Sequence, residues 1–130
     1  MKWGVVLELS APGLAIGLAV VYGMSEGAMW VLWIVLRLMI ALALARWVRR
    51  KHFAHGFCVG ALGAGGAVLL ALALYGRYTQ NHPEFLENAS RFPSLDPRLL
   101  LAAVAVVVGL AHGILQGILA WIASRIVTSR

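Results

Sequence analysis

The sequence predicts an all-α integral membrane protein, built as a bundle of four transmembrane helices. Of its 130 residues, 62% are hydrophobic and 12% are charged, and the mean hydropathy is +0.86. Soluble domains contain about 45–50% apolar and about 25% charged residues, so both values indicate a membrane protein. Four segments have the roughly 20 apolar residues that a spanning helix needs. These segments are apolar on every face, unlike the alternating strands of a barrel.

The four segments form one transmembrane domain, residues 1–130. We expect spans at about residues 3–23, 28–48, 53–75 and 97–126. The first lacks a small-residue cleavage site and contains Glu8, so it is expected to be an uncleaved span and not a signal peptide. Residues 24–27 are only long enough for a tight turn, which makes the first two spans an antiparallel hairpin.

The connection at 77–97 is the only extramembrane stretch of any size. Within it, Pro83 suits the first position of one short helix, because that position needs no N–H donor. Asp96 followed by Pro97 is typical of a helix start with the aspartate as N-cap. We therefore expect the fourth span to begin there.

Charge asymmetry predicts the orientation. One end of the bundle holds an almost purely basic set: Lys2, Arg46, Arg49, Arg50, Lys51, Arg125 and Arg130. The other end holds both signs: Glu26, Arg77, Glu84, Glu87, Arg91, Asp96 and Arg98. Cytoplasmic loops carry an excess of Lys and Arg, so both termini are expected in the cytoplasm and the 77–97 connection outside. The net charge of +6 is thereby assigned to membrane topology and not to nucleic-acid binding.

Small residues recur at the four-residue spacing that lets helix backbones approach closely. The glycines with this spacing are Gly13, Gly17, Gly56, Gly60, Gly109, Gly113 and Gly117. We expect them to pack helices of the same chain together. A homodimer seam along the triple repeat in the fourth span is the alternative.

Four polar side chains lie within the spans: Glu8, Arg37, His112 and Gln116. Ionisable groups in a membrane are costly, face the interior and usually pair. Glu8 and Arg37 are on adjacent helices, so a structural salt bridge between them is expected. The alternative is an ion or proton relay through Glu8, Arg37 and His112.

His112 and Gln116 lie one helical turn apart in the stretch GLAHGILQG (109–117). We expect them to hydrogen-bond to a neighbouring helix, which fixes register among apolar helices. Haem would need a second axial ligand at the same depth, which only His112 of a second copy could supply. No cofactor is therefore expected, and His112→Leu is expected to change thermal stability slightly with no spectral change.

The chain offers no recognisable catalytic or metal site. It has no Ser/His/Asp set, no paired carboxylates beside a cleft and no phosphate loop. His52 and His55 follow the basic run 49–51, which repels a cation, so a metal is not expected there. The single cysteine, Cys58, excludes an internal disulfide.

The order of these features resembles a family of small four-span bacterial membrane proteins known only as a domain of unknown function. The segments FAHGFCVGALGAGG (53–66) and NHPEFLE (81–87) carry the resemblance, together with the basic second connection and the glycine-rich last span. The matching motifs are Gly56-Phe57 with Gly60, and Pro83-Glu84-Phe85-Leu86-Glu87. The resemblance implies four helices in a bacterial inner membrane, and it brings no activity or catalytic residues.

Function is predicted mainly by elimination. We expect a non-catalytic protein, an accessory or assembly subunit of a larger membrane complex. Its partners would be the lipid bilayer and other membrane subunits or further copies of itself. The alternative is a small oligomeric proton-coupled transporter or pore that uses Glu8, which lies near a proline-broken part of its helix.

Overall fold

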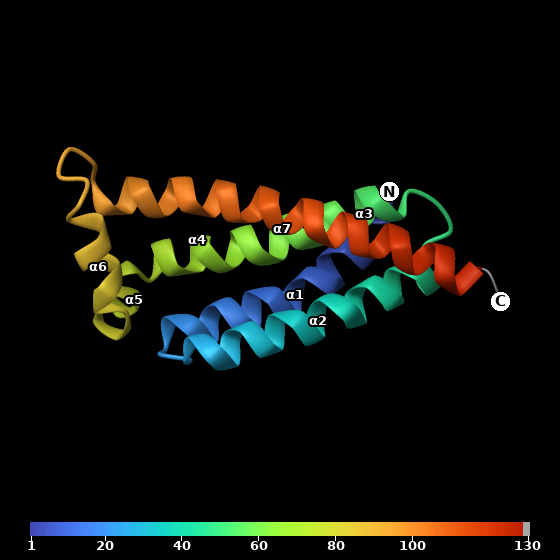
Figure 1. The fold of residues 1–130 in the computed structure, drawn as a ribbon, viewed down its shortest axis with the longest axis horizontal. Coiled ribbons are helices and arrows are strands. Elements are labelled where there is room, and N and C mark those ends of the chain that lie inside the picture. The colour runs from blue at the N-terminus through green and yellow to red at the C-terminus, as the bar shows by residue number, and fades with distance from the viewer. Residues whose placement is uncertain (129–130) are drawn as a thin grey trace.

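The computed structural model describes residues 1–128, which form helices and connections with no strand among them (Figure 1). Arg130 of the basic set lies outside the described residues. The helices are α1 (Trp3–Val21), α2 (Glu26–Trp47), α3 (His52–Gly60), the π-helical turn η1 (Ala61–Gly65), α4 (Gly66–Ala73), α5 (Tyr75–Asn81), α6 (Pro83–Ala89) and α7 (Pro97–Thr128). Four helical segments are long and apolar enough to cross a membrane: α1, α2, the continuous run of α3, η1 and α4, and α7. This confirms the all-helical architecture with four helical segments that are suited to span a membrane.

The ends of the spans follow local capping chemistry. α2 begins at Glu26, slightly before the predicted position, because the Ser25 hydroxyl accepts the N–H of Ala28 at 3.4 Å. α7 begins at Pro97 as predicted, and Oδ1 of Asp96 accepts the N–H of Arg98 at 2.7 Å. An N-cap side chain of this kind satisfies one of the free donors at a helix start.

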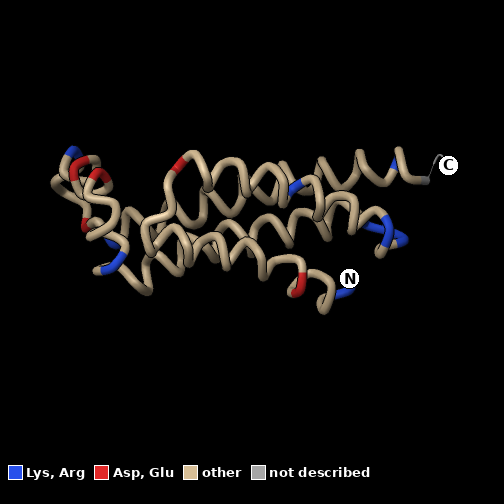
Figure 2. The backbone as a smooth tube through the Cα atoms, turned by 90° about the horizontal axis from the view of Figure 1, so that it is seen from below, with Lys and Arg blue, Asp and Glu red and all other residues tan. Residues whose placement is uncertain are grey.

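The two ends of the bundle differ in shape and charge. Both termini lie at one end, here called the terminal end, and the α1–α2 turn lies with α5 and α6 at the other, the loop end (Figure 1). Basic residues gather at the terminal end, where an acidic position of α1 also lies near the N-terminus, and both signs occur together at the loop end (Figure 2). α7 and α2 converge toward the terminal end and diverge toward the loop end, with α4 between them (Figure 1).

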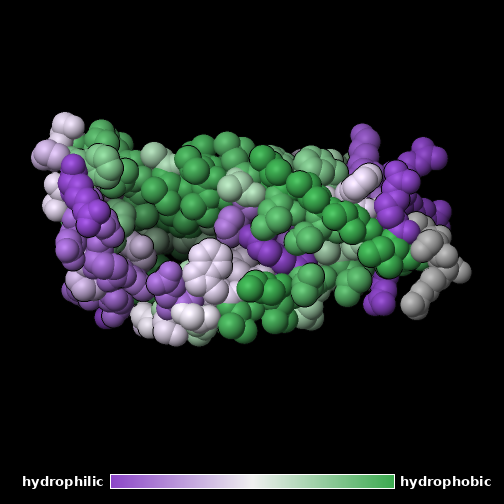
Figure 3. All heavy atoms as spheres, viewed as in Figure 1, coloured by the Kyte–Doolittle hydropathy of each residue, from purple (hydrophilic) through white to green (hydrophobic). Residues whose placement is uncertain are grey.

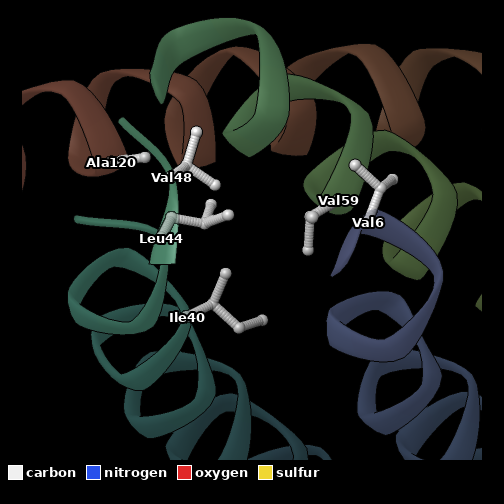
Figure 4. Close-up of a cluster of buried hydrophobic side chains, with 6 residues drawn as sticks. All are labelled: Val6, Ile40, Leu44, Val48, Val59 and Ala120. Carbon is white, nitrogen blue, oxygen red and sulfur yellow. The ribbon is translucent and has the colours of Figure 1, made fainter. Parts of the chain in front are cut away.

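The terminal end is held together by a compact apolar cluster (Figure 4). Its buried members come from α1, α2, α3, α7 and the connection after α2: Val6, Ile40, Leu44, Val48, Val59 and Ala120. Side chains from four spans therefore meet in one place, and this fixes the helices relative to one another.

Glycines set the closest helix contacts, between α3–η1 and α7. A Cβ on Gly56 would lie 2.6 Å from the backbone oxygen of Gln116, and one on Gly60 would overlap the backbone oxygen of His112. Gly65 and Gly109 likewise approach each other, because a Cβ on either would lie 3.3 Å from the other's Cα.

The remaining glycines of the predicted set also face helices of this chain. A Cβ on Gly17 would lie 2.5 Å from Cα of Ala67, and one on Gly13 would lie 3.0 Å from Cα of Gly63. Gly113 and Gly117 meet the backbone of α3 in the same way. The stripe in α7 thus makes contacts within the chain.

The connection between the third and fourth spans holds two short helices, α5 and α6, where the sequence predicted one. α6 begins at Pro83, the position assigned to it, while α5 continues from the third span after a break at Leu74. Two side chains at the end of α5 cap α1. Nδ2 of Asn81 donates to the oxygen of Val21 at 2.9 Å, and Nε2 of His82 lies 2.7 Å from the oxygen of Val20. The bond from Asn81 satisfies a carbonyl that the end of a helix leaves free, whereas the oxygen of Val20 also accepts the N–H of Gly23.

Candidate functional site

Three of the four predicted intramembrane polar residues come together between α2 and α7. A guanidinium nitrogen of Arg37 contacts Nδ1 of His112. One turn along α7, Nε2 of Gln116 donates to the backbone oxygen of Arg37 at 3.1 Å. Arg37 is 9% exposed and Gln116 is 1% exposed. His112 and Gln116 thus do hydrogen-bond across helices, and both bond to Arg37. The sequence had predicted that Arg37 forms a salt bridge with Glu8 instead.

The expected salt bridge between Glu8 and Arg37 does not form. The side chain of Glu8 is exposed, and the one ion pair within residues 1–128 joins His82 and Glu84. The physical reason is the rotation of α1 about its axis. Its buried stripe runs through Val6, Ser10, Gly13, Gly17 and Val21, and a residue two positions after Val6 points to the opposite side of a helix.

The contact with Arg37 determines which nitrogen of the His112 ring carries the proton. A guanidinium has donors only, so Nδ1 of His112 accepts and the ring proton is on Nε2. The indole ring of Trp33 completes the cluster. Its centroid lies 5.6 Å from Cζ of Arg37, and it meets the imidazole of His112 edge to face at 5.5 Å. Both arrangements are attractive, the first between a cation and a π face and the second between two rings.

An apolar cavity of about 270 Å³ lies beside this cluster, toward the loop end. Met29, Trp30 and Trp33 of α2 form one wall, and Leu101, Val104, Val108 and His112 of α7 form the opposite wall. Small residues of α1 and the third span form its floor: Gly17, Ala64, Ala67 and Ala71. The cavity exists because α2 and α7 diverge here, and the hollow is visible between α7 and the start of α2 (Figure 3).

A second, more polar cavity of about 480 Å³ adjoins the first at the loop end. The two share Val20, Met29 and Tyr78 as lining residues. Glu26, Asn81, His82 and Glu84 line the polar one. The two cavities together therefore have a polar opening at the loop end and an apolar interior that reaches His112.

Two groups at this mouth have shifted pKa values. Burial, and then the nearby charge of Glu84, raises the pKa of Tyr78 above its usual 10.0. The pKa of Glu84 lies below its usual 4.5, chiefly because its own backbone N–H hydrogen-bonds the carboxylate, and also because of its contact with His82. The distance between Nδ1 of His82 and Oε1 of Glu84 is 3.0 Å.

The lowered pKa of Glu84 predicts a small acid-dependent loss of stability. A group with a depressed pKa in the folded state stabilises the fold above its unfolded value, here near 4.5, and this contribution disappears as the pH falls through the lower folded value. We expect Glu84→Gln to flatten the fall in melting temperature between about pH 6 and about pH 3. If Glu84→Gln and the unmodified protein show the same pH dependence of the melting temperature, the assignment is wrong.

One histidine at the terminal end, His55, has structural contacts. Nε2 of His55 accepts the backbone N–H of Lys2 at 2.9 Å, and Nδ1 lies 2.9 Å from the oxygen of Lys51. This ring ties the N-terminus to the start of α3, a role that the sequence gave no means of finding. Among residues 1–128, no three His, Cys, Asp or Glu side chains are placed to hold a metal ion.

Arg37, His112 and Gln116 were predicted from the sequence as polar residues within the spans, whereas Trp33 and the cavity were not. Trp33 could have been found from its position one turn before Arg37, whereas the cavity has no sequence signal, because it arises from the angle between two helices. Comparison of the chain with protein-family models, with curated proteins and with solved structures finds no match.

Proposed function

We propose that this protein is a non-catalytic subunit of a larger assembly in a bacterial inner membrane, and that it joins its partner through the outer face of α1. The observation that carries the proposal is the exposed side chain of Glu8 on a membrane-spanning helix. A carboxylate in a spanning segment is costly when it faces lipid, and such groups normally face protein.

The position of Glu8 makes lipid exposure unfavourable. It follows Trp3, the first residue of α1, by five positions, which is about 8 Å along a helix. The short side chain of glutamate reaches back to water less readily than the long side chains of Lys and Arg, which commonly do so. A partner helix that donates a hydrogen bond to Glu8 removes the cost.

The residues around Glu8 suit such a contact. Gly4, Ala11 and Ala15 lie on the same face of α1 as Glu8, and all are exposed. No atom lies within 4 Å of a Cβ built on Gly4. Small residues let a second helix approach closely, so this face combines a packing surface with one hydrogen-bonding group.

Photo-cross-linking in the native membrane tests this proposal. A photoreactive amino acid at Ala15 should form an adduct with a different polypeptide, whereas one at Val31, an exposed residue of α2, should react with lipid only. Lipid adducts alone at Ala15, or adducts between two copies of this chain, would contradict the proposal. Glu8→Leu should reduce the partner recovered in mild detergent, while the matched control Glu87→Leu in α6 should not.

Transport through Glu8, the other function considered, has no observation in its favour. Proton coupling needs a carboxylate that reaches an aqueous path, and Glu8 lines neither of the two cavities described above.

The proposed orientation places the terminal end, with its basic residues, in the cytoplasm. We expect a cysteine at Ser94, in an otherwise Cys58→Ala protein, to react with a membrane-impermeant maleimide applied to intact spheroplasts. A cysteine at Ser129 should react only after lysis. Labelling of both positions from the same side would contradict this topology.

A further inference from the structure

His112, which lines the apolar cavity, has a ring N–H that no other group among residues 1–128 accepts. Because Nδ1 of His112 accepts from Arg37, the ring proton is on Nε2. His112 lines the cavity, and within residues 1–128 Nε2 has no hydrogen-bond partner. A donor in an apolar setting is costly unless it is paired, so a ligand with an acceptor would be favoured here.

The cluster behind His112 strengthens this donor. The guanidinium of Arg37 donates to the opposite side of the imidazole, and hydrogen bonds in a chain polarise one another. The described residues place no carboxylate in contact with Arg37. The inner end of the cavity is therefore electropositive, which favours an oxygen acceptor on the ligand and disfavours a cation.

The depth of His112 in the bilayer limits which hydrogen-bond acceptors can reach it. His112 follows Leu101, buried at the loop end, by 11 positions, and Arg37 follows the first residue of α2 by the same number. At about 1.5 Å per residue, both lie about 16 Å inside a hydrocarbon core that is about 30 Å thick. Phospholipid ester groups lie at the edge of that core, so a phospholipid would place only its acyl chain against His112.

The shape of the cavity favours a flat ring. Trp30, Trp33 and Tyr78 line the cavity, and its floor consists of glycine and alanine. Aromatic side chains stack favourably on planar rings. The volume of about 270 Å³ is close to the lower limit of small-molecule sites, about 300 Å³, and thus suits one ring with its tail extending toward the bilayer.

We propose that this cavity binds the headgroup of a membrane-soluble quinone, with one ring carbonyl accepting the Nε2–H of His112. A quinone carries its carbonyls on a planar ring that moves within the bilayer interior, so it meets the requirements of depth, shape and polarity together. The site lies between α2 and α7, away from the outer face of α1, and goes beyond the proposed attachment role.

Tryptophan fluorescence of the full chain in nanodiscs tests the proposal, because Trp30 and Trp33 line the cavity. Titration with a decyl-substituted benzoquinone should quench the fluorescence saturably. His112→Phe should raise the half-saturating concentration about tenfold, the effect of one hydrogen bond, whereas His112→Gln, which keeps an N–H donor, should retain most of the affinity.

A second pair of variants covers the case in which His112→Phe does not fold. Val108→Phe places a large side chain in the cavity and should abolish saturable quenching, while Val107→Phe, on the exposed face of α7, should leave it unchanged. Decylbenzene should compete at least tenfold more weakly than the quinone. Equal competition by decylbenzene, or the same quenching in both phenylalanine variants, would overturn the proposal in favour of an acyl-filled cavity or simple partitioning.

Discussion

Replacing Gly60 with leucine is expected to lower the free energy of unfolding by about 3 kcal/mol or more. The Cβ of any side chain here would overlap the backbone oxygen of His112 and would lie 2.7 Å from Cβ of Gln116. Backbone on α7 has no rotamer to change, so α3 and α7 must separate along their whole contact. The measurement is unfolding of the reconstituted protein by a denaturing detergent.

Gly4→Leu is the matched control for this substitution. Gly4 also lies in a membrane-spanning helix, but a Cβ there meets no atom within 4 Å. The control should unfold like the unmodified protein, within about 0.5 kcal/mol. If Gly60→Leu were as stable as Gly4→Leu, the close contact between α3 and α7 would be wrong.

The spans and their closest contacts could be predicted from the sequence because both depend on local patterns. A run of about 20 apolar residues is typical of a membrane-spanning helix. Glycines spaced by four, such as Gly56 and Gly60, mark the face of a helix that comes close to another. Which helix they meet depends on the global arrangement, and the sequence left that open between a neighbour in the chain and a second copy.

The wrong partner for Arg37 shows where this reasoning fails. The sequence analysis paired it with Glu8 because opposite charges on adjacent helices attract. Two other signals in the sequence were stronger. Gly13 and Gly17 already marked the buried face of α1, which turns Glu8 outward, and depth placed Arg37 level with His112, near the middle of the membrane.

The apolar cavity lies beyond sequence reasoning altogether. It depends on the divergence of α2 from α7, and that angle is set by packing at the terminal end, around Leu44 and Ala120. No residue type marks such a hollow in advance. Only the unpaired Nε2–H of His112, which becomes visible once Arg37 is known to occupy Nδ1, points to a ligand.

His112→Leu is expected to destabilise the protein by about 3 kcal/mol, considerably more than the slight change that the sequence predicted. The sequence analysis treated His112 as a neutral packing residue, whereas the structure makes it the acceptor for a buried cation. Its removal leaves the buried guanidinium of Arg37 without the imidazole acceptor, while the ring centroid of Trp33 lies 5.6 Å from Cζ. An uncompensated buried charge is the costly outcome of breaking such a contact.

A double-mutant cycle separates this cost from the value of the contact itself. Arg37→Met alone removes the charge and leaves a neutral imidazole nitrogen without a donor, which should cost about 1 kcal/mol. The hydrogen bond from Gln116 ends on the backbone oxygen of Arg37 and is available in every variant. Arg37→Met combined with His112→Leu should therefore recover most of the stability lost in His112→Leu, because apolar replacement of a buried polar pair is often nearly neutral. If the two single effects instead add to within about 0.5 kcal/mol, the guanidinium has found another acceptor and the cluster is not the anchor between α2 and α7.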